Sequence, residues 1–353
     1  MTLYIFKRLL LMLPTLLGIL FFTFLIIQFV PGGPVEQLVN KLSGLDSITE
    51  SSSSSNTYRG SNGLSDEHIE QLNKFYGFDK PFLERFFIMI GNYASFDLGM
   101  SYFHNQSVGD LILSKLPVSI CLGLWSFIIV YLVSIPLGIK KAVNDGSRFD
   151  IISSTIVLIG YSIPGFVLGI GLIVLLGGGS FFDIFPTRGL VSDDWSNLSV
   201  IEKILDYLWH ITLPIICLII GSFAVMTMLT KNSFIDEINK LYTVTARAKG
   251  LSENKVLYSH VFKNAIIPIL TGFPAQFVSA FFTGSILIET IFSLDGIGLL
   301  SYEAIIQRDY PVVMGTLFVF TLIGLLTKLI TDIMYVYVDP RIKFTSSSTQ
   351  RNQ

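Results

Sequence analysis

The sequence predicts an all-α polytopic membrane protein with six transmembrane helices. Hydrophobic residues make up 51% of its 353 residues and charged residues only 14%, whereas roughly 25% charged residues is usual in a soluble domain. The mean hydropathy is +0.63. The apolar residues are gathered into six blocks that contain no Asp, Glu, Lys or Arg. These blocks are Leu9–Pro31, Leu116–Ile139, Ile151–Phe182, Tyr207–Thr230, Asn264–Ile288 and Tyr310–Thr327.

Block length supports the same fold class. Crossing about 30 Å of hydrocarbon takes about 20 helical residues, and five of the six blocks reach that length. The sixth reaches it by continuing to Val338 through Lys328 and Asp332, which lie four residues apart and are expected to pair with each other. Core helices of a soluble protein would be shorter and more interrupted. The predicted spans are 1–30, 116–139, 151–179, 207–230, 264–288 and 312–338.

The first block follows Lys7 and Arg8, as the apolar core of a secretory signal would. It is longer than the roughly 7–15 residues of such a core, and no Ala-x-Ala-like cleavage site follows it. A Pro-Gly-Gly-Pro sequence at residues 31–34 ends the helix instead. We therefore expect residues 1–30 to be retained as the first span.

The distribution of Lys and Arg predicts that both termini are cytoplasmic. With the N-terminus inside, the inner segments are 1–8, 140–150, 231–263 and 338–353, and the short outer loops are 183–206 and 289–309. The inner segments hold 14 Lys and Arg residues and the short outer loops hold three. Such an excess is typical of cytoplasmic loops, and long loops are discounted because they cross the membrane largely regardless of charge. Residues 339–353 are then a cytoplasmic tail.

The long first outer loop, about 31–115, is predicted to be a periplasmic loop with a small helical cap. Its serine-rich stretch at 44–63 is too polar to bury a core and is expected to be flexible. A helix is predicted from Ser65, as N-cap, to Gly77. A second amphipathic segment follows Pro81.

The sequence offers little support for catalysis or for a metal site. No GxxxxGKS/T phosphate-binding loop occurs, and none of the four histidines has a second ligand at metal-binding spacing. His210 is expected to be hydrogen-bonded instead. Cys121 and Cys217 lie in separate apolar blocks. With no nucleophile–base pair we expect no enzymatic activity, and a net charge of -2 gives no basic surplus for nucleic acid.

An ion-coupled secondary transporter or a channel is the alternative from another class. Such a transporter usually needs a carboxylate or His relay near the middle of the membrane. The few ionisable residues near the spans are Glu289 at an outer end and the Lys328 and Asp332 pair toward an inner end. We interpret Glu289 as an interfacial carboxylate and the pair as structural.

Helix breakers interrupt two of the predicted spans. Pro164 and Gly165 lie in the long third block, and Pro274 lies in the fifth. Pro and Gly within a span free backbone groups that only neighbouring helices or a water-filled path can satisfy. These three residues are therefore candidates for a translocation path, and such kinks also occur in purely structural spans.

Residues 231–263 form the only long cytoplasmic connection, with six Lys and Arg residues against three Asp and Glu. Residues 245–250 predict a short helix that ends at Gly250 in a left-handed conformation. Ser252 predicts the N-cap of a second helix, with Val256 packed on Leu251. A helix–Gly–helix of this kind suits docking into a groove of a cytosolic partner, and a plain interfacial helix is the alternative. The candidate docking residues are Thr245, Ala246, Arg247, Ala248, Lys249, Gly250 and Leu251.

The run at residues 242–268, YTVTARAKGLSENKVLYSHVFKNAIIP, resembles the cytoplasmic EAA loop of ABC importer permeases in its peptide-importer version. Val244 and Thr245 stand where Glu and Ala would be, whereas Ala246 and Gly250 match. Other segments along nearly the whole chain are similar to the dipeptide/oligopeptide (DppB/OppB) type, among them KRLLLMLPTL, FVPGGP, SIPGF, ETIFSLDGIGLL and VDPRI. YRG, GSRFDI, TMLTKNSF and GLLSYEA resemble in particular the YejB-type subgroup, associated with uptake of oligopeptides and of the peptide–nucleotide antibiotic microcin C.

This resemblance implies the MetI-like fold of type I ABC importers and a non-catalytic permease subunit in the bacterial inner membrane. It implies as partners a second homologous permease, two cytosolic ABC ATPase domains that bind ATP and Mg²⁺, a periplasmic solute-binding protein and a peptide substrate. No cofactor is expected in this chain itself. ATP binding would close the ATPase domains, move the docked loop and switch the spans between inward- and outward-open states.

The Lys and Arg distribution generates a test of orientation. In a variant whose native cysteines are replaced, Ser53→Cys should react with a membrane-impermeant thiol reagent added to intact spheroplasts. Ser252→Cys should react only after the inner membrane is opened. Reversed labelling would contradict both the orientation and a docking role for residues 231–263.

Overall fold

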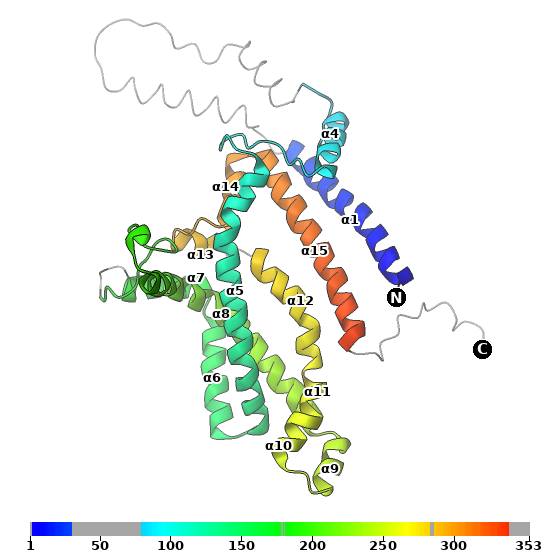
Figure 1. Cartoon of the computed structure of the whole chain (residues 1–353), viewed down its shortest axis with the longest axis vertical. Helices are drawn as coiled ribbons and strands as arrows, with labels where there is room; N and C mark the ends of the chain where they lie inside the picture. Colours follow the sequence, from blue (N-terminus) through cyan, green and yellow to red (C-terminus); the bar gives the residue numbers. More distant parts are fainter. Residues whose placement is uncertain (1, 30–78, 178, 180, 283–285, 339–353) are drawn as a thin grey trace, which may run out of the picture. The chain divides into compact units, whose positions relative to one another are not determined.

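The computed structural model describes residues 2–29, 79–177, 179, 181–282 and 286–338. These residues form helices joined by turns, with one isolated antiparallel bridge between Met100 and Ser107 as their only β pairing. The helices labelled in Figure 1 are α1 (Thr2–Phe29), α4 (Phe82–Ala94), α5 (Val108–Val143), α6 (Arg148–Ser162), α7 (Gly165–Leu176), α8 (Val200–Ile238), α9 (Leu241–Ala248), α10 (Glu253–Val256), α11 (Phe262–Ala265), α12 (Ile267–Phe282), α13 (Ile286–Ile291), α14 (Ile297–Gln307) and α15 (Tyr310–Val338). A π-helical turn, Leu257–Val261, joins α10 to α11.

Within the described residues, six stretches are long and apolar enough to cross a membrane when each of two bent helix pairs is taken as one span, which agrees with the predicted fold class. Four are single helices: Tyr4–Phe29, Val108–Val143, Val200–Ile238 and Tyr310–Met334. Two are bent pairs that satisfy the same criterion together: Arg148–Ser162 with Gly165–Leu176, and Glu253–Ala265 with Ile267–Val278. Each stretch overlaps one of the six predicted blocks.

The third predicted span is not one straight helix. α6 ends at Ser162, α7 begins at Gly165, and the two helices meet at an angle of 93°. Proline disfavours the helical conformation in the residue before it, and Ile163 is accordingly extended, with φ -92° and ψ 119°. Gly165 lets α7 start directly against α8, because a Cβ there would lie 2.5 Å from the carbonyl oxygen of Cys217. The bend therefore lies where Pro164 was predicted to break the helix.

The fifth predicted span bends at a different place from the one predicted. α12 continues through Pro274, so the prediction that Pro274 breaks the helix was wrong. The 51° bend lies between α11 and α12, at Ile266. A proline removes one backbone hydrogen bond and crowds the preceding turn, and in α12 the rest of the helix persists around it.

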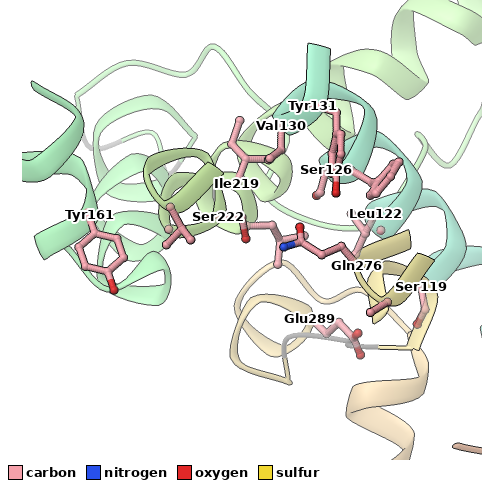
Figure 2. A pocket seen from close by; sticks show the side chains of 16 residues that line it. Ser119, Leu122, Ser126, Val130, Tyr131, Tyr161, Ile219, Ser222, Gln276 and Glu289 are labelled. Carbon is pink, nitrogen blue, oxygen red and sulfur yellow. The ribbon is translucent and has the colours of Figure 1, made fainter. Parts of the chain in front are cut away.

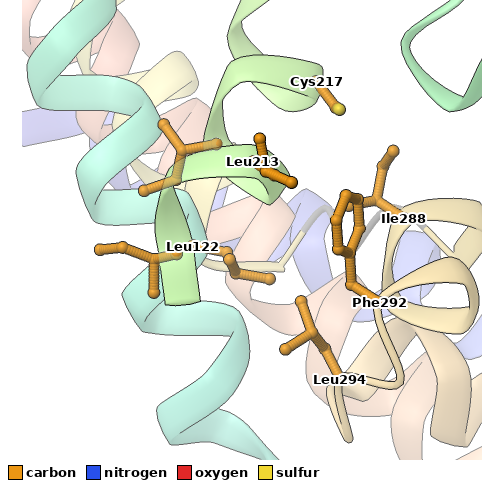
Figure 3. Packing of buried hydrophobic residues seen from close by; sticks show 8 residues of the cluster. Leu122, Leu213, Cys217, Ile288, Phe292 and Leu294 are labelled. Atoms are coloured by element: carbon orange, nitrogen blue, oxygen red, sulfur yellow. The ribbon is translucent and has the colours of Figure 1, made fainter. Parts of the chain in front are cut away.

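The chain divides into two compact units. Unit 1 comprises residues 1–8, 115–299 and 323–353, and unit 2 comprises residues 9–114 and 300–322. Unit 1 contains a cluster of buried apolar residues from α5, α8, α13 and the turn after α13 (Figure 3). Its buried members are Leu122, Ile211, Leu213, Ile215, Cys217, Ile288, Phe292 and Leu294. In lipid such close packing, rather than removal of apolar surface from water, holds helices together.

A buried ionic cluster joins α5, α6 and α8 in unit 1. The Lys141 side chain is fully buried, and its Nζ lies 3.1 Å from Asp150 Oδ1. The same Nζ donates to the hydroxyls of Ser153 and Ser154 at 2.8 and 2.7 Å. Lys231, from α8, binds the other Asp150 oxygen at 2.7 Å. Asp150 therefore ties the start of α6 to two neighbouring helices.

Asp332 pairs differently from the prediction. Its Oδ2 lies 2.8 Å from Arg8 Nη2 and accepts a hydrogen bond from the Tyr4 hydroxyl at 3.1 Å. Among the described residues, no ion pair joins it to Lys328. The planar guanidinium of Arg8 matches a carboxylate better than a flexible ammonium does, and this partner lies too far away in sequence for a local pattern to reveal it.

Unit 2 contains the amphipathic segment that was predicted after Pro81. This segment is α4, and its Phe82 and Phe86 rings pack against Phe21 and Phe24 of α1, with ring centroids 5.2–6.1 Å apart. Aromatic pairs at such separations are favourable in edge-on and tilted arrangements. The serine-rich stretch 44–63 and the helix predicted from Ser65 to Gly77 lie outside the described residues.

The ionic cluster predicts that replacing Asp150 and replacing Asp145 by asparagine have unequal effects on the stability of the protein. Asp150→Asn leaves the buried Lys141 without its carboxylate, so it should lower the free energy of unfolding by about 3–5 kcal/mol. Asp145 also pairs with Lys231, at 2.9 Å, but its side chain is 55% exposed against 6% for Asp150. Asp145→Asn is therefore the matched control and should have little effect. Thermal unfolding of the purified protein in detergent would measure both, and equal melting temperatures for the two variants would contradict the buried role of Asp150.

Candidate functional site

The predicted docking loop lies at one end of unit 1, where α9, α10 and α11 follow α8 (Figure 1). A cluster of small and apolar side chains holds these short helices against α5 and α8, and we call this cluster the loop core. Its buried members are Ile139, Ala142, Phe234, Ala246, Val256, Val261 and Ala265. The docking loop is therefore a packed part of unit 1 rather than a separate surface helix.

Gly250 ends α9 in the predicted left-handed conformation, with φ +79°. Its N–H donates to the carbonyl of Arg247 at 2.9 Å, and the N–H of Leu251 donates to the carbonyl of Ala246 at 3.4 Å. These two bonds form a Schellman motif, whose apolar contact is supplied by Leu251 against the loop core. The turn fixes the direction in which the chain leaves α9.

Polar contacts attach the start of α9 to the end of α8. The buried hydroxyl of Thr243 donates to the carbonyls of Ile238 and Lys240, at 2.7 and 2.6 Å. The Tyr242 hydroxyl donates to Glu237 Oε2 at 2.6 Å. Burial, together with this bond to Glu237, raises the pKa of Tyr242. The two hydroxyls hold α9 in a fixed orientation on α8.

One face of α9 is exposed, and it is largely apolar. Leu241 is 85% exposed and Val244 is 53% exposed, and Thr245 and Ala248 are exposed with them. Positions i, i+3, i+4 and i+7 fall on one side of an α-helix. We call these four residues the α9 outer stripe. Tyr258, on the π-helical turn, adds a further exposed ring.

The seven predicted docking residues divide between two faces. Thr245, Ala248, Lys249 and Gly250 are exposed. Arg247 is half-buried, and its Nε pairs with Glu253 Oε1 at 2.9 Å.

Ala246 and Leu251 turn inward, contrary to the prediction that Ala246 meets a partner. Ala246 is only 6% exposed and belongs to the loop core. It lies three residues after the buried Thr243, and therefore on the same side of α9. The helical period that buries Thr243 and Ala246 also places Leu241 and Val244 on the exposed face of α9. The sequence-based prediction of docking residues did not include Leu241 and Val244.

Unit 1 also contains a cavity of about 860 Å³ (Figure 2). Its walls come from α5, α6, α8, α12 and α13, and apolar side chains such as Leu122, Val130 and Ile219 form much of them. Its polar lining residues are Ser119, Ser126, Tyr131, Tyr161, Ser222, Gln276 and Glu289. The volume lies within the roughly 300–1,000 Å³ of small-molecule sites. We call it the unit 1 cavity.

The predicted helix breakers adjoin this cavity but do not themselves line it. Tyr161 lies three residues before Pro164, and Ala275 and Gln276 follow Pro274 directly, and all three line the cavity. The bend at Pro164 and Gly165 therefore positions one wall indirectly. Which residues contact a substrate remains a prediction.

Glu289 is not the interfacial carboxylate that the sequence suggested. Its side chain is 0% exposed, and its Oε2 accepts a hydrogen bond from the backbone N–H of Leu299 at 2.7 Å. A position at the end of an apolar block looks exposed in sequence, but the turn after α13 folds back over it. His210 is hydrogen-bonded as expected, through Nδ1 to the carbonyl of Asp206 at 2.8 Å. The described part of the chain contains no group of three metal-binding side chains.

Comparison with known protein families gives a match over residues 134–344, more than half of the chain, to the binding-protein-dependent transport system inner membrane component family. The chain belongs to this family. The match contains the docking loop and the α6, α8, α12 and α13 walls of the cavity. A member of this family is a multi-pass component of the inner membrane, and permease subunits of this kind are non-catalytic. These findings confirm the predicted fold class, location and lack of enzymatic activity.

Individual relatives extend the similarity over nearly the whole chain. The peptidoglycan transport system permease protein YejB of Agrobacterium fabrum is 57% identical over 97% of this chain and 98% of its own length. The inner membrane ABC transporter permease protein YejB of Escherichia coli O157:H7 is 53% identical, with the same coverage. The oligopeptide transport system permease protein AppB of Bacillus subtilis is 32% identical over 98% of this chain and all of its own. The resemblance to YejB-type permeases is therefore confirmed.

Among solved structures, an inward-facing form of the MetNI methionine ABC transporter matches with a TM-score of 0.48 and 16% identity. The match covers 65% of this chain and 96% of that one.

Proposed function

We propose that this permease subunit moves peptides from the periplasm to the cytoplasm, driven by ATP hydrolysis in partner ATPases that contact the α9 outer stripe. One observation carries the docking part of the proposal: an exposed apolar stripe on a helix that is firmly held on its other side. Contiguous exposed apolar patches mark interaction sites. In the orientation predicted from the Lys and Arg distribution, residues 231–263 are cytoplasmic, where a soluble ATPase could reach them.

The attachments of α9 make it suitable for transmitting force. Thr243 and Tyr242 fix the helix to the end of α8, and Ala246 packs into the loop core. A displacement of α9 would therefore also move α8 and the inner end of α5. α8 runs without interruption from Val200 to Ile238, and residues from Leu218 to Val225 on it line the unit 1 cavity.

The proposal assigns the remaining parts of the transporter to other chains. No GxxxxGKS/T motif occurs in the 353 residues, so two cytosolic ATPase domains would bind ATP and Mg²⁺. A second, homologous permease would complete the path as a heterodimer, and a periplasmic solute-binding protein would deliver the substrate. The names of the relatives support peptides as the substrate class, either oligopeptides or the peptide parts of peptidoglycan. Peptide–nucleotides such as microcin C share the same peptide chemistry.

Two alanines of α9 provide a matched test of the docking face. Ala248→Trp adds bulk on the exposed side, so the protein should fold normally and meet its partner less well. Overpacking a fitted contact typically costs about 1–3 kcal/mol, which corresponds to roughly 5- to 150-fold weaker association. Copurification of the ATPase with the tagged permease, and uptake of a labelled tripeptide by cells carrying the variant as the only copy, should both fall.

Ala246→Trp serves as the control on the buried side. Because Ala246 lies in the loop core, the same substitution should lower the melting temperature and the abundance of the permease itself. Ala248→Trp should leave both unchanged. Wild-type copurification and uptake in Ala248→Trp would show that α9 is a plain interfacial helix, and the docking role would fall.

A further inference from the structure

Three polar side chains of the unit 1 cavity are open to a ligand or to water. They are Tyr161 of α6, Ser222 of α8 and Gln276 of α12, and each of these residues is exposed in this chain. Figure 2 shows the Gln276 amide directed toward Ser222. Within the described part of the chain, none of the three side chains forms a hydrogen bond. Three helices therefore present accessible polar groups to one cavity.

The other polar groups of the lining are enclosed. The hydroxyl oxygens of Ser126 and Tyr131 are buried. Glu289 is the only charged residue among the described residues of the lining, and its Oε2 accepts a hydrogen bond from the backbone N–H of Leu299. Gly296 covers this carboxylate so closely that a Cβ there would lie 2.6 Å from Glu289 Cδ. The accessible part of the lining is therefore uncharged.

Gln276 lies at a depth where lipid could not satisfy its side chain. It stands in the middle of the apolar block 264–288, and Ser222 lies well within the block 207–230. A primary amide carries two hydrogen-bond donors and one acceptor oxygen, and leaving such a group without a partner in hydrocarbon is costly. Polar side chains within spans accordingly face the interior of a bundle or a water-filled cavity. The face of α12 that carries Gln276 is therefore turned toward water or protein.

We propose that Gln276, together with Ser222 and Tyr161, contacts the peptide bonds of substrates as they pass, and that this uncharged surface lets peptides through regardless of the charge of their side chains. This inference rests on the proposed peptide-import function and deepens it. The NH₂ and C=O groups of the Gln276 amide complement the C=O and N–H groups of a peptide bond. Every peptide has these groups, whatever its sequence. A charged group at the same place would instead attract peptides of opposite charge and repel those of like charge.

Two charged replacements of Gln276 test the uncharged surface in opposite directions. Gln276→Glu should favour uptake of a tripeptide with a central lysine over one with a central aspartate, and Gln276→Lys should favour the reverse. Two unit charges 4 Å apart in water interact by about 1 kcal/mol, so the ratio of the two uptake rates should shift about 5-fold or more from the wild-type ratio. General damage to the transporter would lower both rates alike and leave their ratio unchanged.

Gln276→Leu tests the contact with peptide bonds. Leucine keeps most of the volume and removes the amide, so the apparent KM for uptake of trialanine should rise about 2- to 10-fold, the range for the loss of one neutral hydrogen bond. The melting temperature of the purified permease should stay the same or rise, because the variant no longer places an amide without a partner at this depth. A purely structural role for Gln276 would instead lower the melting temperature.

Cysteine labelling tests whether this face of α12 meets water. In a variant whose native cysteines are replaced, Gln276→Cys should react with a charged methanethiosulfonate reagent in opened membranes, because the reactive form of a thiol is the thiolate, which apolar surroundings disfavour. Leu270→Cys is the matched control. Leu270 is also exposed on α12, at 37%, but it does not line the cavity. It should remain unlabelled.

Each result decides the proposal. An unreactive Gln276→Cys would mean that another protein surface covers this face, and the inference would fall. Wild-type uptake ratios in both charged variants, or an unchanged apparent KM in Gln276→Leu, would also overturn it. If the charged variants do not reach the membrane, the leucine and cysteine variants still decide the question.

These results can be told apart from failure of the import proposal itself. All the Gln276 variants should copurify with the ATPase as the wild type does, because Gln276 lies outside α9 and the loop core. If the wild type imports neither tripeptide, the import proposal fails. If the wild type imports both and the variants behave in the same way, only the inference about the cavity surface fails.

Discussion

Backbone hydrogen bonding within the bilayer is the constraint on which the rest of this structure depends. Water is absent from the hydrocarbon core, so a spanning chain must satisfy its own N–H and C=O groups, and a helix does so locally. The breaks show how strictly this holds. At the 93° bend the N–H of Ile163 still reaches the carbonyl of Gly160 at 3.2 Å, and Leu168 reaches Pro164 at 3.1 Å. The chain changes direction here without leaving these groups unpaired.

Long uninterrupted helices have a mechanical consequence. α8 carries cavity-lining residues in its middle, Lys231 of the ionic cluster further along, and Phe234 of the loop core near its end. A helix of 39 residues is a stiff connection between these places. A force applied at α9 could therefore reach the cavity through movement of α8 as a whole, without a series of independent side-chain rearrangements. The fully buried Lys141, held by Asp150, extends the connection from α8 to α5 and α6.

Local patterns in the sequence predicted the features that depend on local physics. Unbroken apolar blocks gave the six spans, Pro164 gave a break, and Gly250 gave the end of α9. The missed features depend on contacts between distant residues. Asp332 takes its partner from a helix 324 positions earlier (332 − 8), and Glu289 is covered by a turn that folds back after α13. No period within a block encodes either contact.

Ala246 shows a second reason why the docking residues could not be fully predicted from the sequence. The motif that indicates a docking loop does not say which of its residues face the partner and which hold the loop in place. Small residues stand on both sides of α9: Ala246 is buried in the loop core, and Ala248 is exposed on the face that the proposed docking role assigns to a partner. Only the burial of Thr243 and Ala246 together, three residues apart, assigns the two faces. The helical period of α9 can be read from the sequence, but packing against α8 and α5 decides which side of the helix is buried.

The docking end of this connection combines close packing with paired polar groups. Ala246 packs into the loop core, and the hydroxyls of Tyr242 and Thr243 beside it donate to Glu237 and to backbone carbonyls. Slack at the place where a force enters would absorb the displacement, so a helix that transmits force needs this tight attachment on one face. Its opposite face has to stay uncovered for a partner. Leu241 and Val244 are accordingly exposed, although covering them would stabilise the chain, and such a trade-off between stability and function is common at functional sites.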